Sequence, residues 1–492
     1  MICNDPDILK LSYRTRRSVI ALLGLVLIGG AAGAVAELPI YQVRVAENLA
    51  RLSISVCRSV DMPHRFALED TKQARALRNV TYGAQRLGAR RGRVKVPAAE
   101  PGCLSYDFEI ARVREERRAS VLRLGTDLLA SPAAWLLAPV DEVPFEVHFA
   151  LPSGIQVSAP WQPLDDALRR YRVEPSPTGW QPIVAFGRFE QFPIQLPGGR
   201  LDVAVLDGQP RADVAQVQDW VEAAARHVTL TYGTFPVPRA QVVIVPVVGL
   251  DAWGGRGTGD AVPFARVLRR GGIAAQFFVN QIAPLDSYLS DWTATHEFSH
   301  MLLPYVRQSD AWLSEGFASY YQNVLRARAG VLTEEIAWRK LHEGFTRGRR
   351  DDYPDTLAES VHYRGPNMIM RMYWSGAAIA LLADVELRER SGDAQSLDTV
   401  LQQLQACCLP SSRTWSAMEL FDQLDELAGG HVFNDLYRRW IDAVEFPDVD
   451  PVFARLGVDP VGSSVRLLEA PATTLRREIM AVQASPSAAG EQ

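Results

Sequence analysis

The stretch His296-Glu297-Phe298-Ser299-His300 follows the pattern H-E-x-x-H, and the rest of the sequence is interpreted around it. On a helix, residues four positions apart lie on one face, so His296 and His300 can offer imidazole nitrogens to one metal ion. Glu297 lies about 100° further around the same helix. It is therefore expected beside the metal rather than bound to it, where it can take a proton from a water molecule. The pattern predicts a zinc site.

The residues around this motif predict an amphipathic helix. Thr293 shares an arc with both histidines and the glutamate. The opposite arc is apolar and is expected to pack against a core; it consists of Ala294, Phe298, Met301 and Leu302. Pro304 is expected to end the helix. The alternative interpretation is an amphipathic helix whose two histidines are satisfied by hydrogen bonds and bind no metal.

A second predicted helix contains a candidate for the third metal ligand. It includes the segment Trp312-Leu313-Ser314-Glu315-Gly316-Phe317-Ala318, with Ser309 or Asp310 as its cap and Gly330 as its end. Its apolar stripe is formed by Leu313, Phe317, Tyr320 and Val324. Two histidines and a glutamate are an established ligand set for catalytic zinc, so Glu315 is predicted to complete the site. The alternative is a solvated helix glutamate.

H-E-x-x-H followed by W-L-S-E-G-F-A resembles the gluzincin metallopeptidases, in particular the aminopeptidase N and glycyl aminopeptidase families. A second match is the segment Tyr373-Trp374-Ser375-Gly376-Ala377. These families have a Y-x-x-G segment whose tyrosine stabilises the tetrahedral intermediate, so the resemblance implies that role for Tyr373. It also implies a thermolysin-like peptidase domain, a peptide or protein substrate, and one Zn²⁺ ion per chain held by His296, His300 and Glu315.

Two departures from the family pattern bear on the ligand set and on specificity. Fourteen residues, Met301 to Ser314, precede Glu315, where aminopeptidase N relatives have eighteen. Those relatives also bind the free amine of the substrate through a glutamate in a G-x-M-E-N segment, whereas no glutamate occurs here between Asp251 and Trp292. That region contains instead Gly254–Asp260 and Arg266, Arg269 and Arg270. The resemblance therefore supports peptide-bond hydrolysis and leaves aminopeptidase and endopeptidase activity both open.

Length and composition indicate a multidomain globular protein. The chain has 492 residues, of which 47% are hydrophobic, and a formal net charge of −5. The length predicts more than one domain, and the hydrophobic fraction suits sizeable cores. The charge gives no indication of nucleic-acid binding. One basic run, from Arg75 to Lys95, is interpreted as a solvated loop between strands.

The N-terminus has the pattern of a targeting segment. Basic residues precede the uncharged run Val19 to Gly30, and small residues follow as far as Ala34-Val35-Ala36. Cleavage after Ala36 would give an exported protein, periplasmic or extracellular. The alternative is an uncleaved anchor, residues 18–36, that tethers the protein to a membrane.

Cysteine usage agrees with export. Cys57 and Cys103 lie in the same strand-rich region and are predicted to form a disulfide. Adjacent cysteines are hard to bridge without strain. Cys407 and Cys408 are therefore expected to remain unlinked to each other, with one or both buried.

The expected fold class is α+β with several domains. Short alternating strands separated by proline and glycine predict an N-terminal β-sandwich. A change to helical periodicity predicts a mainly helical zinc peptidase domain with two buried strands, Ala240–Val248 and Ala275–Val279. The predicted divisions are the targeting segment 1–36, the β-rich domain 37–200, the catalytic domain 201–450 and the C-terminal segment and tail 451–492.

The preferred hypothesis is an exported zinc metallopeptidase in which Glu297 is the general base and Tyr373 stabilises the oxyanion. A substrate chain is expected to pair with an edge strand within Phe264–Val279. Two alternatives remain: a catalytically silent peptidase-like binding or scaffold protein of the cell envelope, and a zinc hydrolase of a non-peptide bond. A silent protein would lose a metal ligand or Glu297, and all these residues are present.

Overall fold

The computed structural model describes residues 38–113, 121–165, 167–175, 183–208, 212–247, 260–269, 272–349, 355–362 and 366–481. The predicted targeting segment 1–36, the glycine-rich stretch 254–259, Arg270 and the tail beyond residue 481 lie outside the described residues. None of the helices in the described part of the chain is long and apolar enough to cross a membrane.

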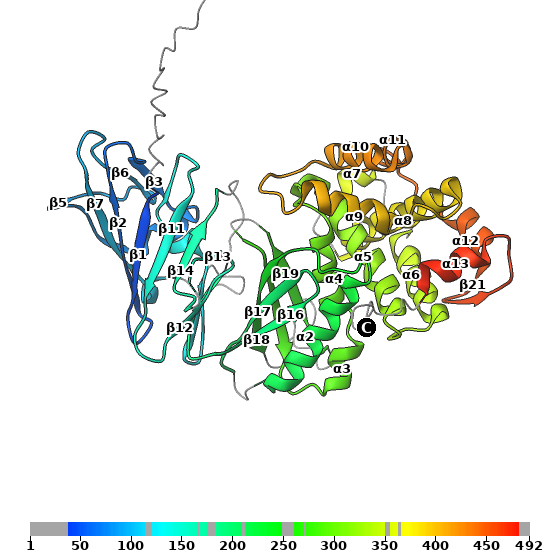
Figure 1. Cartoon of the computed structure of the whole chain (residues 1–492), viewed down its shortest axis with the longest axis horizontal. Coiled ribbons are helices and arrows are strands. Elements are labelled where there is room, and N and C mark those ends of the chain that lie inside the picture. Colours follow the sequence, from blue (N-terminus) through cyan, green and yellow to red (C-terminus); the bar gives the residue numbers. More distant parts are fainter. Residues whose placement is uncertain are drawn as a thin grey trace, which may run out of the picture. The chain divides into compact units, whose positions relative to one another are not determined.

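The first part of the described chain is built from strands, drawn in blue and cyan in Figure 1. Its largest sheet has eight strands in the order β13-β14-β11-β1-β2-β7-β4-β5, in which β1 and β11 pair in parallel and the other neighbours are antiparallel. The strands are β1 (Ile40–Val45), β2 (Arg51–Arg58), β4 (Leu77–Tyr82), β5 (Gln85–Arg86), β7 (Gly102–Glu109), β11 (Phe145–Ala150), β13 (Gln162–Pro163) and β14 (Arg170–Val173).

Two smaller sheets share one hydrophobic core with the large sheet. Their orders are β10-β3-β6 and β12-β15-β9-β8. Phe149 of the large sheet meets Phe186 of the four-stranded sheet with ring centroids 5.5 Å apart, and both side chains are buried. The predicted β-sandwich is therefore confirmed. The added elements are β3 (Arg65–Ala67), β6 (Arg93–Lys95), β8 (Val121–Leu124), β9 (Asp127–Ala130), β10 (Ala138–Pro139), β12 (Gln156–Ser158), β15 (Val184–Gly187), α1 (Pro132–Trp135), η1 (Thr71–Ala76) and η2 (Ile110–Arg112).

The basic run Arg75 to Lys95 is not a loop, so that interpretation was wrong. It contains β4, β5 and β6. The apolar residues between the basic ones, including Val80 and Val94, are buried in the shared core. Arg78, Arg86 and Arg93 thus lie on strands. The number of charges in the run hid the alternation of buried and exposed residues along these strands.

The described cysteines form two disulfides. Cys57 and Cys103 are directly opposite each other on the antiparallel strands β2 and β7, and they are joined as predicted. Cys407 and Cys408 are also joined, which contradicts the prediction that they stay unlinked and buried. Cys407 is exposed and Cys408 is half-buried. The pair lies where α9 (Leu397–Cys408) ends and the backbone becomes extended at Leu409, so helical geometry does not hold the two side chains apart.

A five-stranded sheet follows, in the order β16-β17-β18-β20-β19. Its strands are β16 (Glu190–Leu196), β17 (Gly199–Val205), β18 (Arg239–Val247), β19 (Phe264–Leu268) and β20 (Ala274–Asn280). The central β17, β18 and β20 run in parallel, and both edge strands are antiparallel to their neighbours. The two predicted buried strands are thus present as β18 and β20. The predicted domain border at residue 200 lies within β17.

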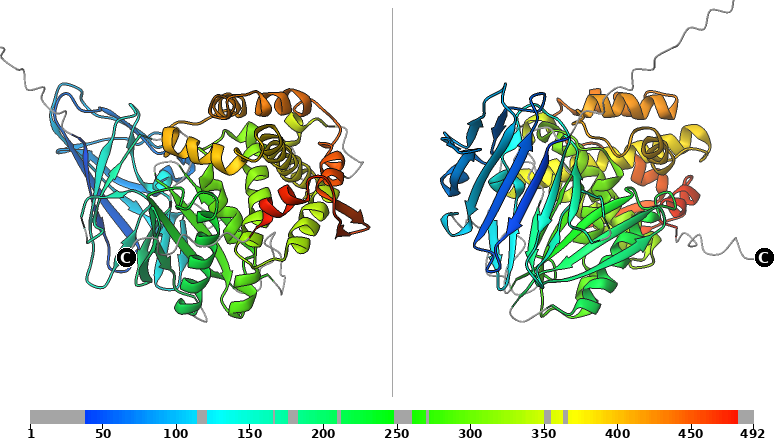
Figure 2. Two further views of the ribbon diagram at one scale, coloured as in Figure 1. Left: turned by 45° about the vertical axis from the view of Figure 1, so that its right-hand side comes forward. Right: turned by 60° about the vertical axis from the view of Figure 1, so that its left-hand side comes forward.

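Both faces of this sheet are covered, as expected for parallel strands. Val203 faces a core that includes Trp220 of α2 (Val214–Thr229). Helix α2 lies along the sheet in Figure 2. Ala204 faces the other way, towards a second cluster with Ala185 of β15. Side chains alternate between the two faces of β17. One face of the sheet therefore packs against helices, and the other packs against strands of the β-sandwich.

From residue 285 the chain is mainly helical, as predicted. The elements are α3 (Leu285–Ser290), α4 (Thr293–Ser299), η3 (His300–Leu302), η4 (Gln308–Asp310), α5 (Ala311–Arg328), α6 (Glu334–Gly348), α7 (Leu357–Ser360), α8 (Pro366–Ser391), α9, α10 (Ala417–Ala428), α11 (Val432–Trp440), α12 (Asp450–Leu456) and α13 (Thr473–Met480), with the hairpin β21 (Val458–Val461) and β22 (Ser464–Leu467). The motif helix α4 ends in the turn η3 just before Pro304, and α5 ends just before Gly330, which has a φ of +75°.

Two glycines set the distance between α5 and α8. A Cβ atom on Gly376 would lie 2.0 Å from the carbonyl oxygen of Trp312 and 2.8 Å from the Cα of Gly316. A Cβ atom on Gly316 would lie 2.2 Å from the carbonyl carbon of Gly376. Real side chains do not tolerate such distances, so the two helix backbones are in direct contact at this point.

The substitution Gly376→Ala tests this crossing. In a helix without neighbours, alanine would stabilise by about 1 kcal/mol relative to glycine. Here the added methyl group meets backbone atoms, and we expect the free energy of unfolding to fall by about 1–3 kcal/mol, measured by urea denaturation. Gly430→Ala is the matched control, because a Cβ there meets no atom within 4 Å. Equal stability of the two variants would contradict the close crossing.

Candidate metal centre

Two imidazoles and a carboxylate come together between α4, η3 and α5. His296 and His300 are buried, and Glu315 is about three-quarters buried, with its side chain 24% exposed. The Nε2 atoms of His296 and His300 lie 3.3 Å and 3.5 Å from Oε2 of Glu315. One ligand atom from each residue falls within 4.8 Å of the others. The shorter connection from Met301 to Ser314 therefore still brings Glu315 to the two histidines.

Both histidines are oriented by neutral residues of α5. Nδ1 of His296 is 2.8 Å from Oε1 of Gln322, and Nδ1 of His300 is 3.0 Å from Oγ of Ser314. An amide oxygen only accepts, so the proton of His296 lies on Nδ1 and is donated to Gln322. This leaves Nε2 as the metal-binding atom. Two imidazoles presented in this way with one carboxylate suit Zn²⁺, so the residues fit the predicted metal.

Gln322 and Ser314 were missed by the sequence analysis. Both are buried on α5, on either side of Glu315 in the sequence. Ser314 stands within the quoted W-L-S-E-G-F-A segment, but a single hydroxyl has no pattern that points to a histidine. The only signal for Gln322 is its spacing seven residues after Glu315, which puts both side chains on one face of the helix.

Arg269 supports the same region from the end of β19. Its guanidinium donates to the carbonyl oxygens of His300 and Leu303 and lies 3.3 Å from Oγ of Ser314. Burial lowers the pKa of Arg269 to about 10, so it stays charged at neutral pH. This residue was noted only as part of an arginine-rich stretch. In the structure it fixes the turn η3, which begins with the second predicted ligand, His300.

Glu297 is buried next to the cluster and does not belong to it. Burial raises the pKa of Glu297 to about 7; the charge of Glu315 also raises it, while His296, Arg269 and a hydrogen bond from the backbone of Val267 lower it. Val267 is in β19, so the predicted base is held against the edge strand of the sheet. This environment is suited to a carboxyl group that exchanges a proton near neutral pH.

Tyr373 reaches the cluster from α8. Its ring is stacked on that of His296, with centroids 5.9 Å apart and planes inclined by 8°. Burial raises the pKa of Tyr373 well above its usual range, and the charges of Glu315 and Glu297 and a hydrogen bond to Glu315 act in the same direction. The hydroxyl group is therefore protonated and available as a donor at the site.

The ionisation of the cluster follows from its close packing. Burial favours the neutral form of Glu315, but the two imidazoles hold its pKa well below its usual range. Burial lowers the pKa of His300, and Glu315 acts in the opposite direction. For His296 burial is again unfavourable, but the hydrogen bond and charge of Glu315 outweigh it and raise the pKa. Protons on Nε2 must leave before a metal can bind, so metal binding at this site releases protons.

Asp310 does not take part in the site. It occupies the N-cap position of α5, but its side chain makes no capping hydrogen bond to that helix. Its carboxylate accepts from Arg307 and from the backbone N–H of Ala417, each at 2.7 Å, and so joins α5 to the start of α10. The predicted capping role of Asp310 was wrong, because its carboxylate accepts from the distant Ala417 and not from the first turn of α5.

A family model for M61 glycyl aminopeptidases matches residues 304–363. No curated protein matches the chain. An aminopeptidase N family protein from Idiomarina loihiensis has a similar structure, with a TM-score of 0.65, 13% identity, and coverage of 85% of this chain and 78% of that one. An M1 zinc metallopeptidase from Deinococcus radiodurans matches with a TM-score of 0.50 and 16% identity, over 84% of this chain and 96% of that one. Native leukotriene A4 hydrolase from Saccharomyces cerevisiae matches with a TM-score of 0.50 and 12% identity, over 83% and 68%.

The structural matches show the fold, and the family match falls on the segment that contains Glu315. The predicted resemblance to the glycyl aminopeptidase and aminopeptidase N families is confirmed, as is the predicted fold class. Together with the cluster of His296, His300 and Glu315, the family match confirms the predicted enzyme class, a zinc metallopeptidase.

Replacing Gln322 tests whether it orients the first ligand. Gln322→Met keeps the size of the side chain and removes the acceptor for Nδ1 of His296, so zinc affinity should fall by about 10–100-fold. Gln322→Glu keeps an acceptor for Nδ1 of His296 and should retain zinc, with a loss of thermal stability because it adds a buried charge. The measurement is competition with a chromogenic chelator at pH 7.5. Unchanged affinity in the methionine variant would show that Gln322 does not act on the ligand.

Proposed function

We propose that this chain is an exported peptidase that hydrolyses peptide bonds at a zinc site formed by His296, His300 and Glu315, with Glu297 as general base and Tyr373 as oxyanion donor. The proposal rests above all on the convergence of two Nε2 atoms and one carboxylate oxygen beside a separate buried carboxyl group. Peptide substrates are implied by the matched family.

Each residue contributes a separate part of the reaction. A bound Zn²⁺ ion supplies a Lewis acid that polarises a carbonyl group and makes water more acidic. Glu297 accepts a proton from the attacking water and passes it to the leaving amine. Its position against Val267 and Arg269 keeps the carboxylate directed at the site, and burial keeps its proton affinity high enough for the transfer.

Tyr373 is proposed to stabilise the charge that develops on the carbonyl oxygen. Its hydroxyl is protonated and already lies within hydrogen-bonding reach of Glu315. When substrate binds, the same hydroxyl can donate to an oxyanion that forms next to the ligand cluster. A donor that is fixed before the reaction and points at the developing charge is worth several kcal/mol.

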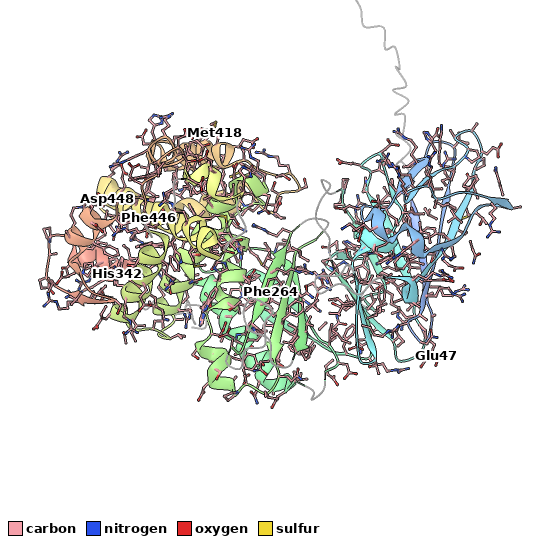
Figure 3. All side chains as sticks on the ribbon, turned by 180° about the vertical axis from the view of Figure 1, so that it is seen from behind. Glu47, Phe264, His342, Met418, Phe446 and Asp448 are labelled. Carbon is pink, nitrogen blue, oxygen red and sulfur yellow. A yellow bond between two sulfur atoms is a disulfide. The ribbon has the colours of Figure 1, made fainter. Side chains whose placement is uncertain are left out.

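Strand β19 is proposed to bind the substrate backbone. It is an outer strand of the five-stranded sheet, and the backbone of Val267 faces Glu297. Phe264, at the start of the strand, is partly exposed and is labelled in Figure 3. An extended peptide that adds to this edge would pass directly over the base. Export, in turn, is supported by the disulfide between Cys57 and Cys103, since such bonds persist in oxidising compartments.

The substitution Glu297→Gln tests the proposed base. The amide has nearly the same shape but does not accept the proton, so zinc content should remain at one per chain while hydrolysis of a peptide library is lost. Glu343→Gln, on the surface of α6, is the control and should retain full activity. A zinc-loaded Glu297→Gln protein with wild-type turnover would refute the mechanism.

The substitution Tyr373→Phe tests the oxyanion donor. Turnover should fall by about 10²–10³-fold with little change in zinc content or in KM, because the donor acts on a group that exists only near the transition state. Tyr320→Phe is the matched control: Tyr320 is a buried tyrosine of α5 whose hydroxyl donates to Asp384. That control should lose thermal stability and keep its kcat. If Tyr373→Phe instead loses thermal stability and keeps its kcat, Tyr373 is a packing residue.

A further inference from the structure

Trp292 differs from every other described tryptophan. Eight of them are buried, each with 7% of its surface exposed or less: Trp135, Trp161, Trp220, Trp312, Trp338, Trp374, Trp415 and Trp440. Trp292 is 45% exposed. A fully buried tryptophan removes a large apolar area from water, and at this position much of that area is left open.

The exposed ring lies beside the metal centre. Trp292 directly precedes α4 and is four residues before His296, so the two side chains share one face of the helix. Their ring centroids are 5.5 Å apart and their planes are perpendicular. Tyr373 packs against the same imidazole. The first predicted ligand thus contacts both the proposed oxyanion donor and an aromatic surface that is open to solvent.

This surface is within reach of a substrate bound at the ligand cluster. An extended peptide advances about 3.3 Å per residue, so the 5.5 Å between the two rings is less than the length of two residues. A chain whose scissile carbonyl lies at the ligand cluster therefore has residues within two positions of the cleaved bond that can reach Trp292. Contact between that side chain and the indole would cover the exposed apolar area.

We propose that Trp292 forms an apolar subsite for a substrate side chain next to the scissile bond, and that it makes the enzyme prefer aromatic or large aliphatic residues there. The inference rests on the proposed function for the position of the substrate. The proposed contact is between Trp292 and a substrate side chain, and it is separate from the roles of Glu297 and Tyr373 in the reaction.

Binding of two matched hydroxamates tests the subsite without requiring turnover. N-acetylphenylalanine hydroxamate and N-acetylglycine hydroxamate present the same zinc-binding group and differ only in the side chain. Calorimetry on the zinc-loaded wild type should give an affinity ratio of about tenfold in favour of phenylalanine, from apolar burial and aromatic contact. Trp292→Ala should reduce the ratio to less than threefold and leave glycine binding and zinc content unchanged, while Trp292→Phe should keep most of the preference.

Met418→Ala is the control, because Met418 is also a large exposed apolar residue, at 52%, but lies on α10 (Figure 3). It should leave both affinities unchanged. The inference is overturned if Trp292→Ala keeps the full ratio, if it weakens both ligands equally with loss of zinc, or if the wild type shows no ratio. If the ratio depends on Trp292 but no peptide in a library is cleaved, the subsite stands and the proposed peptidase function fails. Peptide cleavage without a Trp292-dependent ratio overturns only the subsite.

Discussion

The direct backbone contact between α5 and α8 at Gly316 and Gly376 determines the geometry of the candidate site. Helices in proteins usually pack with their axes about 8–10 Å apart, because side chains separate them. Here neither helix has a side chain at the crossing. Glu315 directly precedes one of these glycines, and Tyr373 is three residues before the other. The crossing therefore places a predicted ligand and a predicted oxyanion donor side by side, and a wider separation would draw the tyrosine away from the cluster.

Further along the same two helices, buried polar groups add to the stability of the pair. The hydroxyl of Tyr320 donates to Asp384 of α8, and Asp384 also accepts from Arg388 and from the backbone N–H of Leu397. A buried carboxylate without these partners would be costly, so the loss of one partner lowers the stability of this region. The glycine contact sets the distance between α5 and α8, and this network adds to the stability of the pair.

Much of the site could be predicted because its residues repeat at short helical spacings. His296 and Glu297 lie in α4, His300 follows as the first residue of η3, and the W-L-S-E-G-F-A segment identified Glu315 through resemblance. What was missed depends on contacts between distant segments. Asp310 serves α10, more than a hundred residues later. The domain borders at residues 200 and 450 stay predictions. Strand β17 extends across the first of these positions and helix α12 across the second.

The neutral partners of the two histidines have an electrostatic explanation. The centre already contains two carboxylates, Glu297 and Glu315, and one guanidinium, that of Arg269, so a further buried carboxylate behind either imidazole would add an unpaired charge at a large desolvation cost. Gln322 fixes the tautomer of His296, and Ser314 holds the ring of His300, without that charge. With a divalent cation bound, the centre retains a net positive charge. This charge lowers the proton affinity of Glu297 from its metal-free value, and it favours the anionic oxygen that the proposed reaction creates.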